Sequence, residues 1–570
     1  MVARDEEAHA LLEEHELYGE DTTVRDGSVS SSTYPALPSH FLKKSCTVRW
    51  IAALIVVSLL SVFGAIITSY GTREQFSENG QDTPLAYQLH AHEHTSRPPT
   101  TLVFSWNVTA GLRSPDGVEK RVYLINDEFP GPLIEARSSD RVVVHVHNGL
   151  SEESLSIHWH GLRMKDQNVM DDGLWGGLVV HSPDEINQPP EDHLIMIGDW
   201  FHRNQTEVLS WFADASSRGN EPVPDSLLVN GQGRFDCSMA VPARPVVCSQ
   251  IAVKELKPLL RKVNNEKTRI RVVNTGSIAG FTMRMDGAMM RPVRVDGGFD
   301  VHSEATENVG ILYPGERVDI DVEWMDNHSQ GRWLTIYMDD ENFGYTNEAL
   351  NPVQSFPILH HGTEIPNRKD LEPNETQILD PRNLKAAKKV VDMPSVANQT
   401  ILLYAKTEKL AHMDYEPVGF INHTSWKPQS PPLISQNRSD WDEHQLIPFI
   451  ATSPGNPTRV DIVINNLDDG AHPFHLHGHS FYVLSTYRDE GRGSWGSYNS
   501  YSGEAPPNGL DLDFSLRKDT VSVPRRGHVV LTFVADNPGI WALHCHMLVH
   551  MARGMAMGLH VDRDLSASGL

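Results

Sequence analysis

The chain has 570 residues, of which 39% are hydrophobic and 22% are charged. This ordinary globular composition excludes a wholly disordered chain and a polytopic membrane protein. The formal net charge is −25, and so acidic a chain repels phosphate backbones, which excludes nucleic acid as an expected partner.

The first predicted element is a transmembrane helix over residues 50–70. This run carries no charge, is rich in Ile, Leu, Val and Ala, and is long enough to cross a bilayer core. Lys43, Lys44 and Arg49 precede it, so the positive-inside rule makes residues 1–49 a cytoplasmic tail. The alternative is a cleaved signal peptide, which the long acidic tail disfavours. We therefore expect a single-pass type II membrane protein whose remaining residues are lumenal or extracellular.

Glycosylation signals agree with this topology, because all of them follow the hydrophobic run. The sequons begin at Asn107, Asn204, Asn327, Asn374, Asn398, Asn422 and Asn437. A non-reducing compartment also permits a disulfide between Cys237 and Cys248, which are close in sequence. An acidic dileucine pattern ending at Leu12 leaves two destinations open, the plasma membrane and an endosome or vacuole.

Short alternating strands dominate the rest of the chain after a polar linker at 71–99. Three blocks of such strands predict an all-β fold of three Greek-key β-sandwich domains in series. We place these domains at 100–190, 191–360 and 397–563. The stretch 361–396, rich in Pro, Asn and Lys, is interpreted as a second linker.

Histidine and cysteine gather near the carboxyl end of the chain. His544 and His546 flank Cys545, and alternate residues of a strand face opposite sides, so this strand can ligate metal on both faces. A cysteine with two histidines and a weak axial methionine is the ligand set of a blue-copper site. His550 and Met555 follow shortly after and offer two of these ligands.

Two further histidine motifs repeat the two-residue spacing. His158 and His160 form one pair, and His475 and His477 form another. His472 precedes the second pair and can point away from it, which makes it a candidate for the remaining imidazole beside the cysteine. One such pair arises easily by chance on an amphipathic strand. Three pairs, one of which encloses a cysteine, favour metal binding over unrelated buried histidines.

These motifs resemble three of the four copper signatures of the multicopper oxidase family. They are H-W-H-G from His158, H-P-F-H-L-H-G-H from His472 and H-C-H-x3-H-x3-G-M from His544. The phrase Asp519-Thr-Val-Ser-Val-Pro also fits. The resemblance covers most of residues 100–563 and is closest to fungal laccases and their ferroxidase and ascorbate-oxidase cousins. It implies cupredoxin-like domains, the first of them truncated, and a bridged cysteine pair in some relatives.

The resemblance also implies how copper would be divided among these residues. Type 1 copper, which takes one electron at a time from a reducing substrate, would be held by His472, Cys545, His550 and Met555. Type 2 copper would be held by His158 and His475. The type 3 pair would be held by His160, His477, His544 and His546. Electrons would pass from the cysteine through its two histidine neighbours, and four electrons would reduce dioxygen to water. An axial methionine should keep the type 1 potential comparatively low.

The fourth signature of the family is absent between Met170 and Leu174. In relatives this region carries a Gln-Cys-Pro-Ile phrase and a Trp-Tyr-His-Ser-His phrase. Its loss leaves four of the six type 3 histidines and should expose sheet edges in the first domain. One explanation is a segment skipped in the gene model, which the well-fitting flanks favour. The other is a genuine variant with type 1 copper and a crippled oxygen site.

The leading hypothesis is a membrane-anchored laccase-like oxidase that uses phenol-like donors and dioxygen. A ferroxidase needs acidic residues near His472 and His550, which the sequence pattern does not identify. Ascorbate oxidation is a further alternative. A non-catalytic copper-binding or electron-transfer protein is the alternative from another class, if the missing ligands are truly absent. Oxygen consumption with a phenolic donor distinguishes that protein from an oxidase.

Overall fold

The computed structural model describes residues 85–163, 174–185, 189–260, 267–325, 332–359, 378–391, 393–452, 457–489 and 495–563. The predicted tail at 1–49 and the predicted transmembrane helix at 50–70 lie outside these ranges. So do the junction at 164–173 and the sequons at Asn327 and Asn374. Among the described residues, no helix is long and apolar enough to cross a bilayer.

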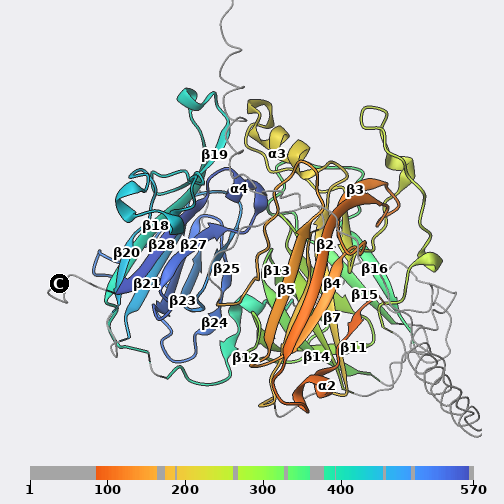
Figure 1. Cartoon of the computed structure of the whole chain (residues 1–570), viewed down its shortest axis with the longest axis horizontal. Helices are drawn as coiled ribbons and strands as arrows, with labels where there is room; N and C mark the ends of the chain where they lie inside the picture. Colours follow the sequence, from red (N-terminus) through yellow and green to blue (C-terminus); the bar gives the residue numbers. More distant parts are fainter. Residues whose placement is uncertain are drawn as a thin grey trace, which may run out of the picture. The chain divides into compact units, whose positions relative to one another are not determined.

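The strands form three successive pairs of sheets, and the first pair is small (Figure 1). Its first sheet has the order β3-β2-β5, with bounds Lys120–Ile125, Thr101–Arg113 and Arg141–Asn148. Its second sheet pairs β4 (Gly131–Arg137) with β6 (Gly176–His181). Side chains alternate across a strand, so Trp106 and Val108 of β2 face inward together and meet Ile125 and Ile134 in a small core.

The second pair of sheets surrounds a larger hydrophobic core. One sheet has the order β1-β7-β9-β14-β11-β12-β17, with bounds Tyr87–Gln88, Glu191–Trp200, Thr268–Asn274, Arg317–Trp324, Ala288–Val295, Phe299–His302 and Lys385–Ala386. β8 (Ser226–Val229) pairs with β7 beside this path. The other sheet has the order β13-β10-β15-β16, with bounds Asn308–Leu312, Phe281–Met285, Arg332–Met338 and Val353–Ile358.

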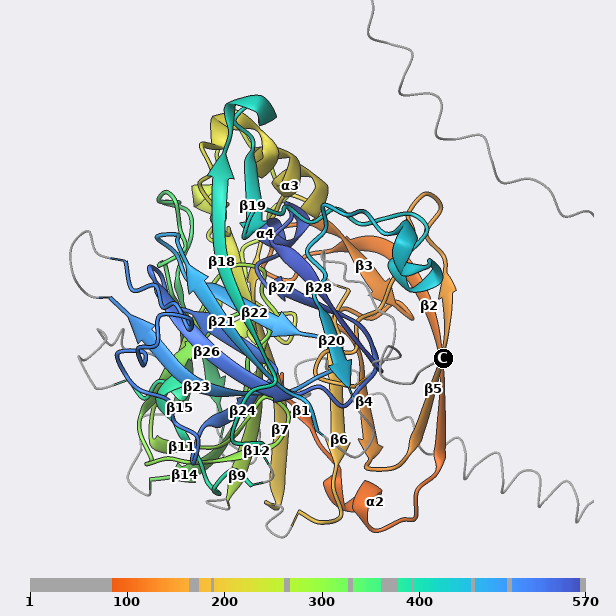
Figure 2. The ribbon, with the colours of Figure 1, turned by 90° about the vertical axis from the view of Figure 1, so that its left-hand side faces the viewer.

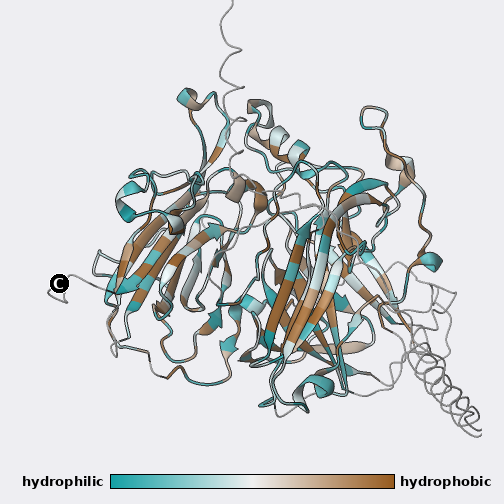
Figure 3. Cartoon of the chain, viewed as in Figure 1, coloured by the Kyte–Doolittle hydropathy of each residue, from teal (hydrophilic) through white to brown (hydrophobic). Residues whose placement is uncertain are grey.

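The third pair of sheets, drawn in teal to blue in Figure 1, encloses another extensive core. One sheet has the order β19-β18-β21-β26-β23-β24, with bounds Pro417–Ile421, Gln399–Lys409, Arg459–Asn466, Gly527–Val534, Phe481–Arg488 and Leu516–Lys518. The other has the order β20-β28-β27-β22-β25, with bounds Phe449–Thr452, Ala556–Arg563, Gly539–Cys545, His472–Leu476 and Thr520–Val523. In Figure 3 the brown, hydrophobic residues concentrate on strands, whereas loops are mostly teal.

Among the described residues, three short α-helices accompany the sheets: α2 (Ala91–Thr95), α3 (Gln205–Ala213) and α4 (Leu548–Ala552). α3 begins at a capping box, in which the Asn204 side chain accepts from the Glu207 N–H and the Glu207 carboxylate accepts from the Asn204 N–H. Figure 2 shows α3 and α4 beside the hairpin of β18 and β19. The predicted mostly-β architecture is confirmed.

The same strand order occurs in all three pairs of sheets. Comparison of the three shows that the first pair lacks a strand beside β5. β2 and β5, β7 and β9, and β18 and β21 are parallel neighbours, each flanked by an antiparallel strand, β3, β8 or β19. β9 then pairs antiparallel with β14, and β21 with β26. β5 has no such partner among the described strands. It is a largely exposed edge strand, with Val142 38% and Val146 42% exposed.

The described part of each predicted linker includes a short strand that pairs with a sheet. In the linker at 71–99, Leu85, Ala86 and Leu89 are buried, and β1 pairs with β7. In the linker at 361–396, β17 pairs with β12. Both segments fold because they complete sheet edges, and burying these apolar side chains stabilises them. All described residues belong to one compact unit.

The predicted disulfide is present between Cys237 and Cys248. Four sequon asparagines are exposed: Asn107, Asn204, Asn398 and Asn437. Asn422 is half-buried, and its amide donates a hydrogen bond to the Leu402 carbonyl at 3.3 Å. It is therefore the least accessible of the described sequons.

Candidate metal centres

Cys545 and two histidines meet inside the third pair of sheets. β22 begins at His472 and runs antiparallel to β27, which ends at Cys545, and α4 then carries His550 back to the same place. Cys545 Sγ lies 3.7 Å from Nδ1 of His472 and 3.8 Å from Nδ1 of His550. The two Nδ1 atoms are 3.2 Å apart, and all three residues are buried. The structure therefore brings together three residues that span 78 positions of the sequence.

The fourth predicted ligand of this centre, Met555, lies beside the cysteine. It is fully buried, and its carbonyl accepts a hydrogen bond from the Cys545 N–H at 3.0 Å. Gly554 precedes it with a φ of 102°, a left-handed conformation that glycine adopts without strain and that turns the chain from α4 into β28. A buried thiol, two imidazoles and a thioether are soft and intermediate donors that copper prefers. The residues present therefore fit a type 1 copper ion.

Two carboxylates that the sequence pattern did not identify contact the outer edges of these histidines. Asp468 Oδ2 lies 3.0 Å from Nε2 of His472, and Glu221 Oε1 lies 3.2 Å from Nε2 of His550. Their side chains are 22% and 24% exposed, so both reach solvent. The four-residue spacing before His472 could have suggested Asp468. No local signal marks Glu221, because it is far away in sequence.

Six imidazoles form a second group on the side of β27 opposite the cysteine centre. The ligand atoms of His158, His160 and His475 all lie within 4.8 Å of one another. His477 Nε2 lies 3.0 Å from His544 Nε2. His546 completes the group, and its ring centroid lies 5.1 Å from that of His160. The structure thus groups His160 with His158 and His475, whereas the family resemblance places it with the type 3 ligands.

The nitrogen atoms of this second group are also in the form that metal binding requires. Nε2 of His475 is buried and has no hydrogen-bond partner among the described residues. Burial, together with a smaller contribution from the imidazole of His475, lowers the pKa of His544 to about 4. Burial lowers the pKa of His160 and of His546 as well. These imidazoles are therefore neutral at pH 7, which is the form that binds metal.

The pKa shifts at the cysteine centre differ from those of the six-histidine group. Burial acts to lower the pKa of His550, but hydrogen bonds with Cys545 and Glu221 outweigh burial and raise this pKa to about 9. Burial acts to raise the pKa of Asp468, yet its hydrogen bond with His472 lowers the pKa below the ordinary value. Asp468 is therefore ionised at neutral pH, at the solvent-facing edge of a predicted copper ligand.

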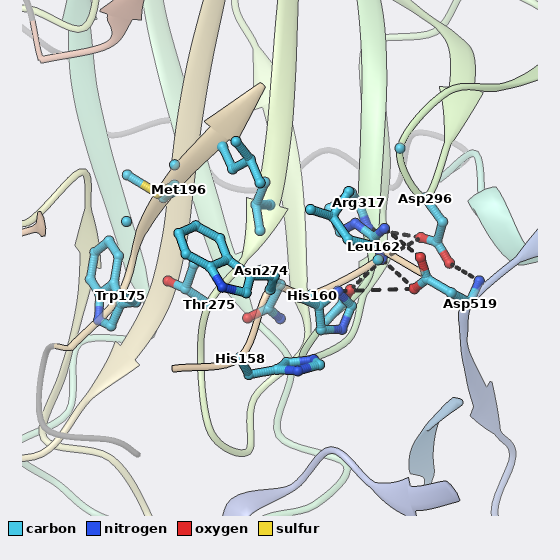
Figure 4. A pocket seen from close by; sticks show the side chains of 18 of the residues that line it. His158, His160, Leu162, Trp175, Met196, Asn274, Thr275, Asp296, Arg317 and Asp519 are labelled. Atoms are coloured by element: carbon cyan, nitrogen blue, oxygen red, sulfur yellow. Dashed lines mark hydrogen bonds and ion pairs between the residues drawn. The ribbon is translucent and has the colours of Figure 1, made fainter. Parts of the chain in front are cut away.

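A buried ion pair positions the six-histidine group. Arg317 of β14 holds Asp519 through two hydrogen bonds, of 2.5 and 2.6 Å. The Asp519 backbone carbonyl accepts a hydrogen bond from Nδ1 of His475 at 2.9 Å, which leaves Nε2 to face the group. Figure 4 shows His160 beside this pair. Arg317 thereby connects the second pair of sheets to the third, at the metal centre.

Comparison with protein families matches three stretches of the chain. Residues 107–183, 191–360 and 421–564 each match a family model described as multicopper oxidase. Together these stretches span well over half of the chain.

Individual relatives and structures agree with this result. The chain is 28% identical over 526 residues to Laccase-2 of Cryptococcus neoformans var. grubii, covering 80% of this chain and 83% of that protein. It is 28% identical over 523 residues to the iron transport multicopper oxidase fetC of Epichloe festucae, covering 82% of this chain and 78% of that protein. The solved structure of Fet3p, a multicopper oxidase that functions in iron import, superposes with a TM-score of 0.69 at 21% identity. This superposition covers 81% of this chain and 90% of the Fet3p chain.

Proposed function

This chain belongs to the multicopper oxidase family, and we propose that it is a laccase-like oxidase that removes one electron at a time from phenolic donors and passes electrons to dioxygen. The observation that carries the proposal is the buried trio of Cys545, His472 and His550, with carboxylates at its solvent-facing edge. Copper bound at the two centres would supply the one-electron redox chemistry.

The protein's own groups support proton removal from a phenol and electron transfer between the two centres. A phenol becomes a strong acid when it loses an electron, so a nearby base that accepts its proton favours the oxidation. Asp468 and Glu221 are positioned for that task, since each contacts one of the histidines of the centre. Cys545 is bonded through the backbone to His544 and His546, so the two centres are connected by the shortest covalent path the chain allows.

Replacing Glu221 or Asp468 with the amide, as Glu221→Gln or Asp468→Asn, should lower kcat/KM for guaiacol about tenfold, equivalent to about 1.4 kcal/mol of barrier. The amides keep the side-chain shape but accept no proton. Steady-state oxygen uptake measures the effect, and Glu119→Gln, at an exposed position in the connection between β2 and β3, is the matched control. Unchanged guaiacol kinetics in both variants would show that neither carboxylate acts as the proton acceptor.

Ferrous iron is the second candidate donor, and the same two carboxylates favour it. Hard divalent cations prefer carboxylate oxygens, and Asp468 and Glu221 lie at the outer edges of the two histidines. If iron is the substrate, the amide variants raise KM for Fe²⁺ and leave guaiacol oxidation unaffected. Ascorbate belongs in the same comparison. Blue thiolate-to-copper absorption without oxygen uptake from any donor would instead indicate a non-catalytic copper protein.

We also propose that the described domains lie in the lumen or outside the cell, anchored by residues 50–70. The disulfide Cys237–Cys248 and the four exposed sequons support an oxidising, glycosylating compartment. Treatment of the protein purified from its own cells with a glycosidase should increase its electrophoretic mobility. Extraction should require detergent if the anchor is retained.

A further inference from the structure

We propose that β5 is a dimer interface, at which a second copy of this chain adds its own β5 as an antiparallel neighbour. This interface belongs to the first pair of sheets and does not depend on the copper chemistry of the proposed function. In the other two pairs of sheets an antiparallel strand covers the equivalent edge, β14 beside β9 and β26 beside β21. The eight residues of β5 have no strand on that edge among the described residues. An antiparallel strand is therefore the neighbour that this edge is shaped to receive.

The side chains of β5 leave this edge unprotected. Val142, Val144 and Val146 share one face, because alternate residues of a strand point the same way. Val144 packs against the small core, whereas Val142 and Val146 are largely exposed. Proteins usually protect an exposed edge with charged side chains, a proline or a bulge. β5 carries one arginine, no acidic residue and no proline, and it pairs with β2 without a register shift. The edge is therefore open to another strand.

A second copy fits this edge because β5 is complementary to itself. In an antiparallel pair centred on Val144, each Val142 lies opposite the partner's Val146, which extends one apolar row across both strands. The charges at the two ends of the strand also match. Arg141 begins β5 and Glu152 follows its end; both are exposed, and neither has an ion-pair partner among the described residues. Antiparallel pairing brings each Arg141 to the end that carries the partner's Glu152.

The predicted glycan at Asn107 does not obstruct this pairing. Asn107 of β2 lies beside His147 of β5 in the parallel register, so both side chains are on the face opposite Val146. A glycan there projects from the face of the sheet, whereas the partner strand approaches in the plane of the sheet.

Pairing also extends the part of the first domain that lies next to the six-histidine group. The register of β2 and β5 places Trp106 beside Val146. The Trp106 ring centroid lies 5.7 Å from that of Trp159, which stands between His158 and His160 in the sequence. The partner strand therefore continues the face on which this tryptophan pair packs, beside two predicted copper ligands.

A disulfide trap tests the pairing and its register together. Opposite residues of an antiparallel pair have Cα atoms about 4.5–5.5 Å apart, which is within disulfide reach. The full chain carrying Val144→Cys, oxidised with diamide in detergent micelles, should therefore migrate as a covalent dimer on a non-reducing gel. Val142→Cys, on the same face, is the matched control and should stay at the background of the parent chain. Its counterpart lies four residues along the partner strand, roughly 13 Å away. The double variant Val142→Cys with Val146→Cys should form the dimer again.

Sedimentation of the full chain in detergent tests the interface without cross-linking. One strand edge is smaller than the interface of a permanent dimer, so the dimer should dissociate on dilution. Val146→Lys should raise the dimer Kd at least about tenfold, because it places a charge in the apolar row. Val103→Lys is the control, since Val103 is 61% exposed on β2 and faces the other side of the sheet; it should leave Kd unchanged.

The outcomes separate this interface from the proposed function. Far-UV circular dichroism checks that each variant folds, and if Val146→Lys does not, the disulfide trap decides alone. A chain that stays monomeric at every concentration, with no cross-link through Val144→Cys, would overturn the interface and leave the proposed oxidase activity unaffected. Equal cross-linking through Val142→Cys and Val144→Cys would also overturn it, because random collisions would explain both.

Discussion

Cys545→Ser should abolish the blue absorption and reduce guaiacol oxidation to background, a loss of roughly a thousandfold or more, which corresponds to about 4 kcal/mol of activation free energy. Cys545 Sγ is the only thiol in the buried trio with His472 and His550. The absorption requires a thiolate bound to copper, and a serine hydroxyl stays protonated at neutral pH and binds copper poorly. Because a serine hydroxyl is smaller than the thiol it replaces, it fits the same space without displacing the surrounding core.

Two measurements make this result specific. Absorption and oxygen uptake should fall together in Cys545→Ser. Met555→Leu, which replaces the predicted axial ligand with a side chain of similar volume, should keep the colour and raise the redox potential, as a redox titration would show. A blue Cys545→Ser protein would contradict the assignment of the type 1 centre.

Asp519→Ala should lower the free energy of unfolding by about 3–5 kcal/mol, the largest loss of stability expected for a single substitution here. The Asp519 side chain is 4% exposed and that of Arg317 is 14% exposed, so the substitution removes the nearer of two buried counter-charges and leaves the guanidinium only Asp296, at 3.7 Å. The same change removes the link between β14 and the third pair of sheets, close to His475. Chemical denaturation in the presence of a chelator measures the effect without the contribution of bound copper.

An exposed ion pair supplies the control. Asp469 pairs with Arg526, but its side chain is 75% exposed, so Asp469→Ala should change the free energy of unfolding by less than about 1 kcal/mol. The double variant Arg317→Met with Asp519→Leu should recover much of the loss, because both partners of this pair are then replaced by apolar side chains. Equal effects of Asp519→Ala and Asp469→Ala would show that the buried pair contributes no more than a surface pair.

The motifs around Cys545 were readable from the sequence because strand geometry links spacing to direction. A period of two places His544 and His546 on one face and Cys545 on the other. β27 carries His544 and Cys545, His546 follows directly after it, and the His544 and His546 rings are stacked. The copper-binding family, the mostly-β fold and the disulfide followed from equally local patterns. The exposed edge of β5 also follows from the sequence, since the missing signature removes the strands that would cover it.

Only the tertiary structure decided the contacts between segments that are distant in the chain. Glu221 and His550 are 329 positions apart, and Arg317 and Asp519 are 202 positions apart, so no periodicity relates them. The packing of residues 85–99 and the grouping of the six imidazoles depend on how separate sheets meet. Sequence patterns encode which face of an element is apolar or metal-binding, whereas the partner of each face is chosen by packing over the whole fold.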